Sequence, residues 1–299
     1  MDNIQKIGFI INPISGTRTK ANIPNLIDCL IDKNKFEVDI RFTEYAGHAI
    51  SIATEMAQLN YAIVASVGGD GTMNEIASCL VHTNTSLALI PCGSGNGLVR
   101  HLRIPLSVKD AINMINNCRI VEIDYGTAND VKFFCTCGVG FDAYIGNEFA
   151  KATKRGFYTY FKSVVNEFFK YKPKKYKLKH GDHVIRERAF LVTFANASQY
   201  GNNAYIAPAA DIQDGLIDVS ILKPFPIYRV MGLGMRLMTK KIAKSQYVQL
   251  LKAEEIMIKR KKKDIFHFDG EPCIMKKKIK IKAHKGGLKV LVPINSPLK

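Results

Sequence analysis

The chain has 299 residues, of which 47% are apolar, a length that suits one large domain or two ordinary ones with real cores. It contains no apolar run of the roughly 18 residues that a membrane-spanning helix needs. Its start, MDNIQKIGFIINP, lacks the layout of a secretory signal, so we expect a cytoplasmic protein.

The charge is strongly basic, with 43 Lys and Arg against 26 Asp and Glu, a net charge of +17. Such an excess favours nucleic acid, anionic membrane surfaces or phosphorylated substrates as partners, although charge runs are often only solvated faces. Seven cysteines, among them Cys29, Cys79, Cys92 and Cys118, lie mostly in apolar runs and are expected to be small core residues. The pair in FFCTCGVG lacks a second cluster that would complete a metal site.

The first 120 or so residues alternate between apolar runs and helical patterns. Strands are predicted at 6–12, 36–42, 62–67 and 87–91, and helices at 21–33, 48–59 and 72–81. Apolar strands separated by amphipathic helices indicate a three-layer α/β domain with a parallel sheet, which we assign to residues 1–122.

Beyond residue 122 the pattern changes to strands with short turns, at 121–128, 131–140, 176–198, 216–223, 264–272 and 278–294. Period-two alternation, as in IKIKA, is typical of an antiparallel sheet with one solvated face. Helical patterns at 158–170 and 228–244 interrupt it. We therefore predict a β-rich, sandwich-like second domain over residues 123–299.

Three glycine-containing loops follow strands of the first half: INPISG, VGGDGT and IPCGSGNGLVRHL. Ligands bind at the carboxyl ends of strands in open α/β sheets, and these loops would present backbone amides and helix N-termini to a polyphosphate. Within the second loop, Asp70 indicates a cation at the phosphates or an oriented hydroxyl. The alternative is a turn aspartate that caps the helix near Thr72.

The stretch VGGDGTMNEIASCL resembles the GGDGT-x-NE motif of the diacylglycerol kinase and sphingosine kinase catalytic domain, in a superfamily with NAD kinases and phosphofructokinases. INPISG, IPCGSGNGLVRHLRIP, APAADIQDGLIDV and FDGEP extend the resemblance, in order, over nearly the whole chain. It implies a kinase that uses ATP and Mg²⁺ to phosphorylate a lipid hydroxyl, most simply that of diacylglycerol, giving phosphatidic acid. A sphingoid base, another lipid alcohol or NAD are the alternative acceptors.

The resemblance also implies site residues. The nucleotide-contacting positions are Asn12, Thr43, Gly68, Gly69, Asp70, Gly71, Thr72, Met73, Asn74, Glu75 and Ser94. Asp269 and Glu271 match the acidic pair from which the family draws its general base, so the catalytic set is Asp70, Asp269 and Glu271. Asp214, with backbone oxygens of Asp211 and Leu216, matches a structural Mg²⁺ site of the bacterial members. Asp124 either completes the acidic network or ends a strand.

The third loop departs from the bacterial diacylglycerol kinases, which commonly show a GTANDF-like sequence where this chain has GSGNGL. Their aspartate is Gly97 here, and GSGN resembles the sphingosine and ceramide kinases instead. This difference keeps a sphingoid base among the expected acceptors.

A lipid acceptor requires contact with a membrane. The aromatic segment 157–171, FYTYFKSVVNEFFKY, is flanked by lysines and suits an anionic interface, so we expect peripheral membrane association and no nucleic-acid partner. The alternative is a core helix packed on the second-domain sheet. The oligomeric state, a homodimer included, is not encoded in any motif of the sequence.

Overall fold

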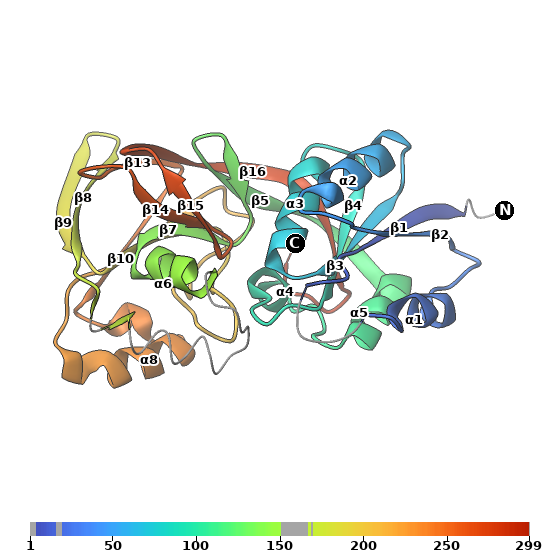
Figure 1. The fold of residues 1–299 in the computed structure, drawn as a ribbon, viewed down its shortest axis with the longest axis horizontal. Coiled ribbons are helices and arrows are strands. Elements are labelled where there is room, and N and C mark those ends of the chain that lie inside the picture. Colours follow the sequence, from blue (N-terminus) through green and yellow to red (C-terminus); the bar gives the residue numbers. More distant parts are fainter. Residues whose placement is uncertain (1–3, 16–19, 151–166, 169, 299) are drawn as a thin grey trace. The chain divides into compact units, whose positions relative to one another are not determined.

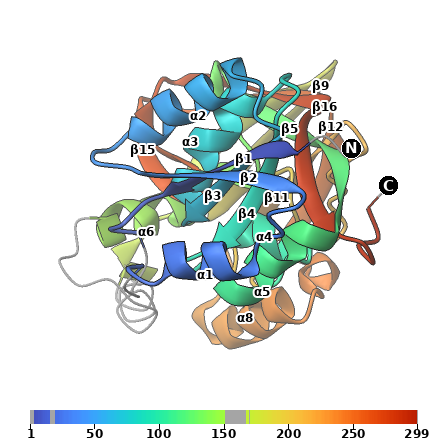
Figure 2. The same cartoon turned by 90° about the vertical axis from the view of Figure 1, so that its right-hand side faces the viewer.

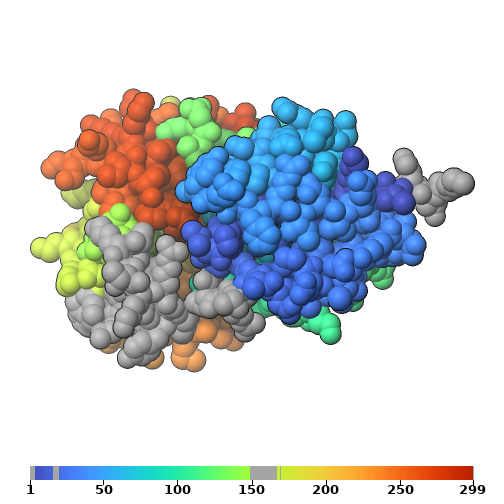
Figure 3. All heavy atoms as spheres, turned by 45° about the vertical axis from the view of Figure 1, so that its right-hand side comes forward, coloured from blue at the N-terminus to red at the C-terminus, as the bar shows by residue number. Residues whose placement is uncertain are grey.

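The computed structural model describes residues 4–15, 20–150, 167–168 and 170–298, and the other residues are grey in Figures 1 and 3. The chain forms two compact units, Met1–Ile123 with Gly286–Lys299 and Asp124–Lys285. No helix in the described ranges has the length and apolarity to cross a bilayer.

The first unit is a parallel sheet covered by helices on both faces, in the strand order β2-β1-β3-β4. Figures 1 and 2 show α2 and α3 on one face and α1 and α5 on the other. Its elements are β1 (Gln5–Ile11), α1 (Ile23–Leu30), β2 (Phe36–Phe42), α2 (His48–Gln58), β3 (Ile63–Gly68), α3 (Asp70–Leu80), β4 (Ser86–Pro91), α4 (Gly97–His101), α5 (Val108–Met114) and η1 (Ile115–Asn117).

Burial in this unit follows the apolar patterning of the sequence. Strands β3 and β4 are buried along their whole length, as expected of strands with helices on both faces. In α2, Ala49, Ile52, Ala53 and Met56 recur at helical spacing and form its buried face. The predicted α/β class of this half is confirmed.

The second unit is a sandwich of antiparallel sheets. One sheet has the order β12-β11-β10-β7-β14-β15, and the other brings β13, β8 and β9 beside the first part of β16. Its strands are β6 (Val131–Phe133), β7 (Thr136–Gly140), β8 (Lys174–His180), β9 (His183–Ala189), β10 (Leu191–Ala195), β11 (Ile217–Leu222), β12 (Val248–Ala253), β13 (Glu255–Lys259), β14 (Asp264–Phe268) and β15 (Glu271–Met275). It shares two strands with the first unit: β5 (Cys118–Ala128), which enters it at Asp124, and β16 (Lys278–Pro293), which leaves it after Lys285. Its helical segments are α6 (Phe141–Ala150), η2 (Ile227–Arg229), α8 (Val230–Met238) and η3 (Ile242–Lys244).

The sandwich core comes from the inward residues of both sheets, among them Phe194, Val219 and Phe266 from one and Ile258 and Ile281 from the other. The alternation seen in the sequence therefore describes two sheets that bury one face against each other. This confirms the predicted β-rich class of the second half.

The last strand ends in the first unit. Its end pairs in parallel with β4, with Val290 opposite Leu87, and Arg119 Nη2 donates to the carbonyl of Ser296 at 2.7 Å. Residues 286–299 thus belong with the parallel sheet, whereas the sequence analysis placed all of 123–299 in one domain. The chain changes unit at Gly286 and Gly287, whose φ angles of 62° and 106° bend the strand.

Several elements differ from the expectations. Helices α5 and α6 and strands β12 and β13 were not predicted, and 176–198 contains three strands. The helix expected at 228–244 divides into η2, α8 and η3, and the break between α8 and η3 contains Lys240, whose φ of 60° is left-handed. Cys29 is exposed, contrary to expectation, whereas Cys135 and Cys137 are buried as small core residues.

Candidate active site

Three loops at the carboxyl ends of β1, β3 and β4 lie side by side in the first unit. The Asn12 amide donates to the Val67 carbonyl at 3.1 Å, and the Cys92 amide donates to the Gly68 carbonyl at 2.8 Å. These bonds extend the parallel ladder into the loops, so the predicted nucleotide segments are brought together at one edge of the sheet.

Close packing explains the glycines of these loops. A Cβ on Gly93 would lie 2.9 Å from Gly69 Cα, and one on Gly68 would lie 2.7 Å from Thr72 Cβ. Gly69 itself has a φ of −99°, which other residues adopt readily. The glycines are thus required by the approach of one loop to another and to the first turn of α3.

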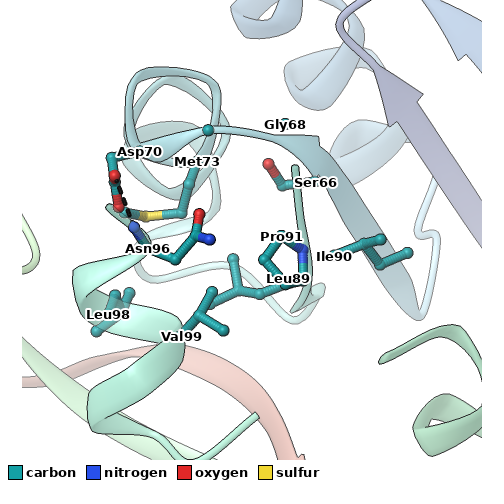
Figure 4. A pocket seen from close by; sticks show the side chains of 11 residues that line it. Ser66, Gly68, Asp70, Met73, Leu89, Ile90, Pro91, Asn96, Leu98 and Val99 are labelled. Atoms are coloured by element: carbon teal, nitrogen blue, oxygen red, sulfur yellow. Dashed lines mark hydrogen bonds between the residues drawn. The ribbon is translucent and has the colours of Figure 1, made fainter. Parts of the chain in front are cut away.

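Asp70 links the second and third loops. It is the first residue of α3, and its carboxylate accepts from the Asn96 amide at 3.1 Å (Figure 4) and from the Gly97 amide at 3.2 Å. These amides belong to the start of α4, so the aspartate caps the neighbouring helix. Asp70 therefore fixes the GSGN loop against the GGDGT loop.

The pocket behind these loops is small. It is lined by Ser66, Met73, Pro91, Leu98 and Val99 together with the glycine loop, and its free volume of about 10 Å³ has room for about one water molecule (Figure 4). A nucleotide cannot enter it. Phosphates would instead meet the amides at the start of α3, which helical geometry leaves without intrahelical acceptors.

Lys20 anchors the first loop and was not predicted. It is almost fully buried, and its ammonium donates to the Asn12 carbonyl and to Ser15 Oγ, both at 2.6 Å. Burial lowers the pKa of Lys20. Asn12 in turn donates from Nδ2 to Thr72 Oγ1 at 2.9 Å, which connects this loop to α3. A single lysine after a loop carries no sequence signal for this role.

The other predicted nucleotide residues surround the same loops. Thr43 is buried at the end of β2, where its amide donates to the Ile11 carbonyl at 2.9 Å. Met73 is buried, Ser94 is exposed, and Glu75 Oε1 accepts from the Gly47 amide at 3.3 Å. The Met73 side chain lines the pocket interior, which leaves only its backbone for the predicted contact with a nucleotide.

In the second unit, the DGE motif forms a two-residue hairpin turn. Phe268 pairs with Glu271, and Asp269 and Gly270 between them have φ angles of 47° and 93°. Positive φ at both central positions is characteristic of the type I′ turn that Asp-Gly favours. The turn fixes the backbone of Glu271 at the first position of β15.

The two carboxylates of this motif have different surroundings. Asp269 is buried, and its oxygens accept from the amides of Phe134 at 2.9 Å, Cys135 at 2.8 Å and Thr136 at 2.9 Å. Glu271 is exposed. Asp269 therefore holds the hairpin to the start of β7, and Glu271 is the carboxylate presented to solvent.

A buried asparagine extends this support. Asn196 donates from Nδ2 to the carbonyls of Asp124 at 2.8 Å and Phe134 at 2.9 Å, and the Asp124 carboxylate accepts from the Gly215 amide at 2.6 Å. Asp124 is thus bonded to the loop before β11. Asn196 was not predicted, because its partners lie 72 and 62 residues away in the sequence.

A second unpredicted cluster lies within the same unit. Asp142 Oδ2 accepts from Thr193 Oγ1 at 3.0 Å and from the Tyr200 hydroxyl at 2.9 Å, and it lies 3.2 Å from His267 Nε2. His267 is buried, two residues before the Asp-Gly turn. Its contact with Asp142 connects the start of α6 to β14, the strand that leads to Asp269.

The residues that match a structural Mg²⁺ site hold a lysine instead. Asp214 Oδ2 accepts from Lys252 Nζ at 2.6 Å, and the same ammonium lies 3.2 Å from Asp218 Oδ2 and 3.4 Å from the Ala209 carbonyl. Asp211 is exposed and accepts from the Gln213 amide. Within the described ranges no group of three or more His, Cys, Asp or Glu residues is arranged to bind a metal.

The ammonium supplies the positive charge of this loop. Burial alone would lower the pKa of Lys252, but Asp214 and Asp218 raise it above the ordinary lysine value. Burial raises the pKa of Asp218, although the neighbouring Lys252 acts in the opposite direction. A divalent ion beside an ammonium would be repelled. The arrangement of Asp211, Asp214 and Leu216 therefore does not fit a bound Mg²⁺, although Leu216 does donate its amide to Asp214 Oδ1.

Most of the segment 157–171 lies outside the described residues. Of its described members, Phe168 and Tyr171 pack in an aromatic cluster with Phe141 and Phe190, at centroid distances of 5.3–6.0 Å. These two side chains thus pack in a core cluster, as the alternative to membrane contact predicted. The expected membrane contact of the preceding residues remains a prediction.

Comparisons with known proteins match both units. The diacylglycerol kinase catalytic domain family matches residues 6–128, and the YegS C-terminal NAD kinase beta sandwich-like domain matches residues 135–292, more than half of the chain. The chain belongs to the YegS-like lipid kinase family. The suspected membership is thereby confirmed, and kinases of this kind imply the use of ATP.

Individual relatives of the YegS-like family are distant in sequence. A protein of Chromohalobacter salexigens named probable lipid kinase YegS-like is 28% identical to this chain, and the match covers 78% of this chain and 77% of that protein. A protein of the same name from Pseudomonas syringae pv. tomato is 27% identical, and the match covers 91% of this chain and 90% of that protein. The structure of a diacylglycerol kinase from Bacillus anthracis aligns with a TM-score of 0.77 at 19% identity, covering 99% of this chain and all of that one. This last likeness concerns the fold alone.

Proposed function

We propose that the protein transfers the γ-phosphoryl group of ATP to the hydroxyl of diacylglycerol, giving phosphatidic acid. The observation that carries the proposal is the contrast within the Asp-Gly-Glu turn. Three amides engage the Asp269 carboxylate, whereas the rigid turn presents the exposed Glu271. An exposed carboxylate at a defined backbone position can take the proton of an alcohol as a general base.

The proposed reaction has one group transfer. The lipid hydroxyl oxygen forms a bond to the γ-phosphorus as the bond to the β–γ bridging oxygen breaks, and ADP leaves. The hydroxyl proton passes to the Glu271 carboxylate late in the transfer. In a loose transition state the bond from the attacking oxygen to phosphorus is still little formed, and the hydroxyl becomes acidic only as that bond forms. Asp269 acts as a positioning residue through the backbone of the turn.

The loops of the first unit are the proposed nucleotide site. Amides at Gly69 to Thr72 lie at the N-terminal end of α3, where the helix dipole favours phosphate. Asp70 keeps the third loop in place by its bonds to Asn96 and Gly97. Mg²⁺ is proposed only as the companion of ATP, whose phosphate charge it neutralises.

The acceptor has a second candidate, a sphingoid base, favoured by the GSGN loop. Gly97 carries no side chain where bacterial diacylglycerol kinases place an aspartate, and its amide donates to Asp70. NAD is the third acceptor to be compared.

An apolar pocket of about 220 Å³ in the second unit is not the place of the reacting hydroxyl. Strand β12 forms part of its wall, and the lining residues are Leu178, His180, His183, Ile185, Gln249, Leu251 and Ile256. Strand β12 is five positions from β15 in the sheet order, and strands are spaced by about 4.8 Å. Glu271 therefore starts a strand about 24 Å from β12.

The test is phosphorylation of a total lipid extract with labelled ATP, followed by mass identification of the product and by diacylglycerol, sphingosine and NAD as separate acceptors. We expect labelled phosphatidic acid.

Glu271→Gln should lower kcat by about 10²–10⁴-fold, whereas the substitution Glu254→Gln, at an exposed glutamate of the same unit, should leave kcat unchanged. Asp70→Asn should weaken ATP binding, because the Asn96 and Gly97 amides donate to different oxygens of Asp70, and the NH2 group that replaces one of them cannot accept. Wild-type turnover in Glu271→Gln would refute the assignment of the base.

A further inference from the structure

Helix α8 has apolar residues on two opposite faces. Its inner face carries Leu233, which is buried, and Leu237, which packs against the same core cluster. The Leu237 carbonyl accepts from the Tyr205 amide at 3.0 Å, which ties the helix to the loop after β10. These contacts are enough to hold α8 on the second unit, at whose outer edge Figures 1 and 2 both show it.

The outer face is exposed and equally apolar. Met231, Met235 and Met238 recur at i, i+4 and i+7, which places them on one side of a helix. Their side chains are 79%, 66% and 63% exposed, and Tyr228, one turn before them, is 72% exposed. A continuous apolar stripe on a folded surface marks an interaction site.

The segment that carries this stripe has only positive charges. Residues 223–247 contain six basic residues, Lys223, Arg229, Arg236, Lys240, Lys241 and Lys244, and no acidic residue. Lys223 pairs with Glu187, and Lys240 lies over the Tyr205 ring at 4.6 Å. A complementary partner therefore has an apolar region beside negatively charged groups, as the interface of an anionic membrane does.

Two further features favour a membrane over a second copy of this chain. A symmetric contact would bring the same basic residues against themselves, at a cost in like-charge repulsion. Methionine side chains are flexible and adapt to irregular apolar surroundings such as acyl chains. A helix of nine residues is too short to span a bilayer, so it would lie in the plane of the interface.

We propose that the outer face of α8 docks the protein on the surface of an anionic membrane, with Met231, Met235 and Met238 entering the acyl boundary and Arg236, Lys241 and Lys244 meeting the headgroups. The proposal rests on the proposed function, because a kinase of diacylglycerol must take its acceptor from a bilayer. It locates the membrane contact in a segment distinct from 157–171.

The test compares binding to vesicles of phosphatidylcholine alone and of phosphatidylcholine mixed with phosphatidylglycerol, by co-sedimentation of the full chain. The triple variant Met231→Gln, Met235→Gln, Met238→Gln should bind the mixed vesicles at least about tenfold more weakly. The matched control Leu59→Gln, Leu106→Gln, Ile120→Gln also removes three exposed apolar side chains, but in the first unit, and should bind like the wild type. Equal thermal unfolding temperatures exclude misfolding as the cause.

A second pair of variants tests the charges. Arg236→Gln, Lys241→Gln, Lys244→Gln should lose the preference for phosphatidylglycerol and most of its salt dependence. Lys261→Gln, Lys262→Gln, Lys263→Gln removes three exposed charges from the turn before β14 and should retain both. Equal losses in the two variants would mean that net charge, rather than α8, directs binding, and would overturn the proposal.

Two further measurements separate this proposal from the proposed function. The ratio of activity on diacylglycerol in vesicles to activity on a short-chain, water-soluble diacylglycerol should fall about tenfold in the methionine variant. If the wild type phosphorylates neither the vesicle-bound nor the short-chain diacylglycerol, the proposed function is refuted. The vesicle-binding experiment still tests whether α8 is the docking surface. Retained vesicle binding in the methionine variant, or a wild-type dimer that this variant converts to a monomer, refutes the docking surface.

Discussion

At the scale of single residues, the supporting contacts of the candidate site are buried polar groups with partners far away in the sequence. Asn196 bonds to two carbonyls from segments more than 60 residues earlier, and Lys20 fixes the first loop by contacts to main-chain oxygen. Asp70 and Glu271 can be singled out from the sequence because their neighbours form motifs. Asn196 and Lys20 cannot, because only the fold brings their partners to them.

Asn196→Ala would leave the Asp124 and Phe134 carbonyls without their donor in a buried place. We expect the free energy of unfolding to fall by about 1–3 kcal/mol and kcat to fall, because Phe134 also helps to hold Asp269. The KM for ATP should stay the same, since the nucleotide loops belong to the other unit. Denaturant unfolding and kinetics measure these effects. The half-exposed Asn147→Ala is the control, and a changed KM with constant kcat would contradict the positioning role.

Lys252 gives a prediction for pH. Its pKa is raised in the folded protein, so its ion pairs stabilise the fold fully below the ordinary lysine value of 10.5, and the contribution is lost as pH rises through the higher folded value. The difference in unfolding temperature between wild type and Lys252→Met should therefore be constant near neutral pH and shrink above about pH 10.5. EDTA should leave the wild type unchanged. Stabilisation of the wild type by added Mg²⁺ would show that the loop binds a metal after all.

At the scale of elements, apolar runs and turn residues predicted the structure best. The strands of the parallel sheet were predictable because they are buried on both faces. The Asp-Gly pair is the dipeptide that two-residue hairpin turns favour, and the φ angles of Asp269 and Gly270 agree with it. Helix α5 was overlooked although Ser107 accepts from the Asp110 amide at 3.4 Å, a capping pair that the sequence shows. Helix α6 follows β7 directly, without a break in composition.

Two glycine turns provide a matched test of the DGE hairpin. Gly270 and Gly181 both have positive φ, both lie in hairpins of the second unit, and an added Cβ would meet no atom within 4 Å at either. Gly270→Ala and Gly181→Ala should each cost about 1–2 kcal/mol of stability, for backbone reasons alone. Because Glu271 follows Gly270, only Gly270→Ala should also lower kcat. Equal activities of the two variants would argue against Glu271 as the base.

At the scale of the whole molecule, the sequence divides the chain once, whereas the folded chain returns to its first unit at the end. Local patterns cannot reveal this return, because β16 alternates as one strand through both units. The predicted domain of residues 1–122 therefore lacks a strand of its own sheet.

The consequence can be tested by truncation. Leu288, Val290, Leu291 and Val292 are fully buried, and each contributes about 1.5–3 kcal/mol on burial, so their loss removes about 6–12 kcal/mol. This is comparable to the whole stability of a typical domain, about 5–15 kcal/mol. A chain that ends at Lys285 should therefore lose cooperative unfolding of the first unit and its ATP binding, as measured by calorimetry and nucleotide titration. A chain that ends at Pro293 keeps these four side chains and should retain both. A folded, ATP-binding chain ending at Lys285 would show that the parallel sheet is complete without β16.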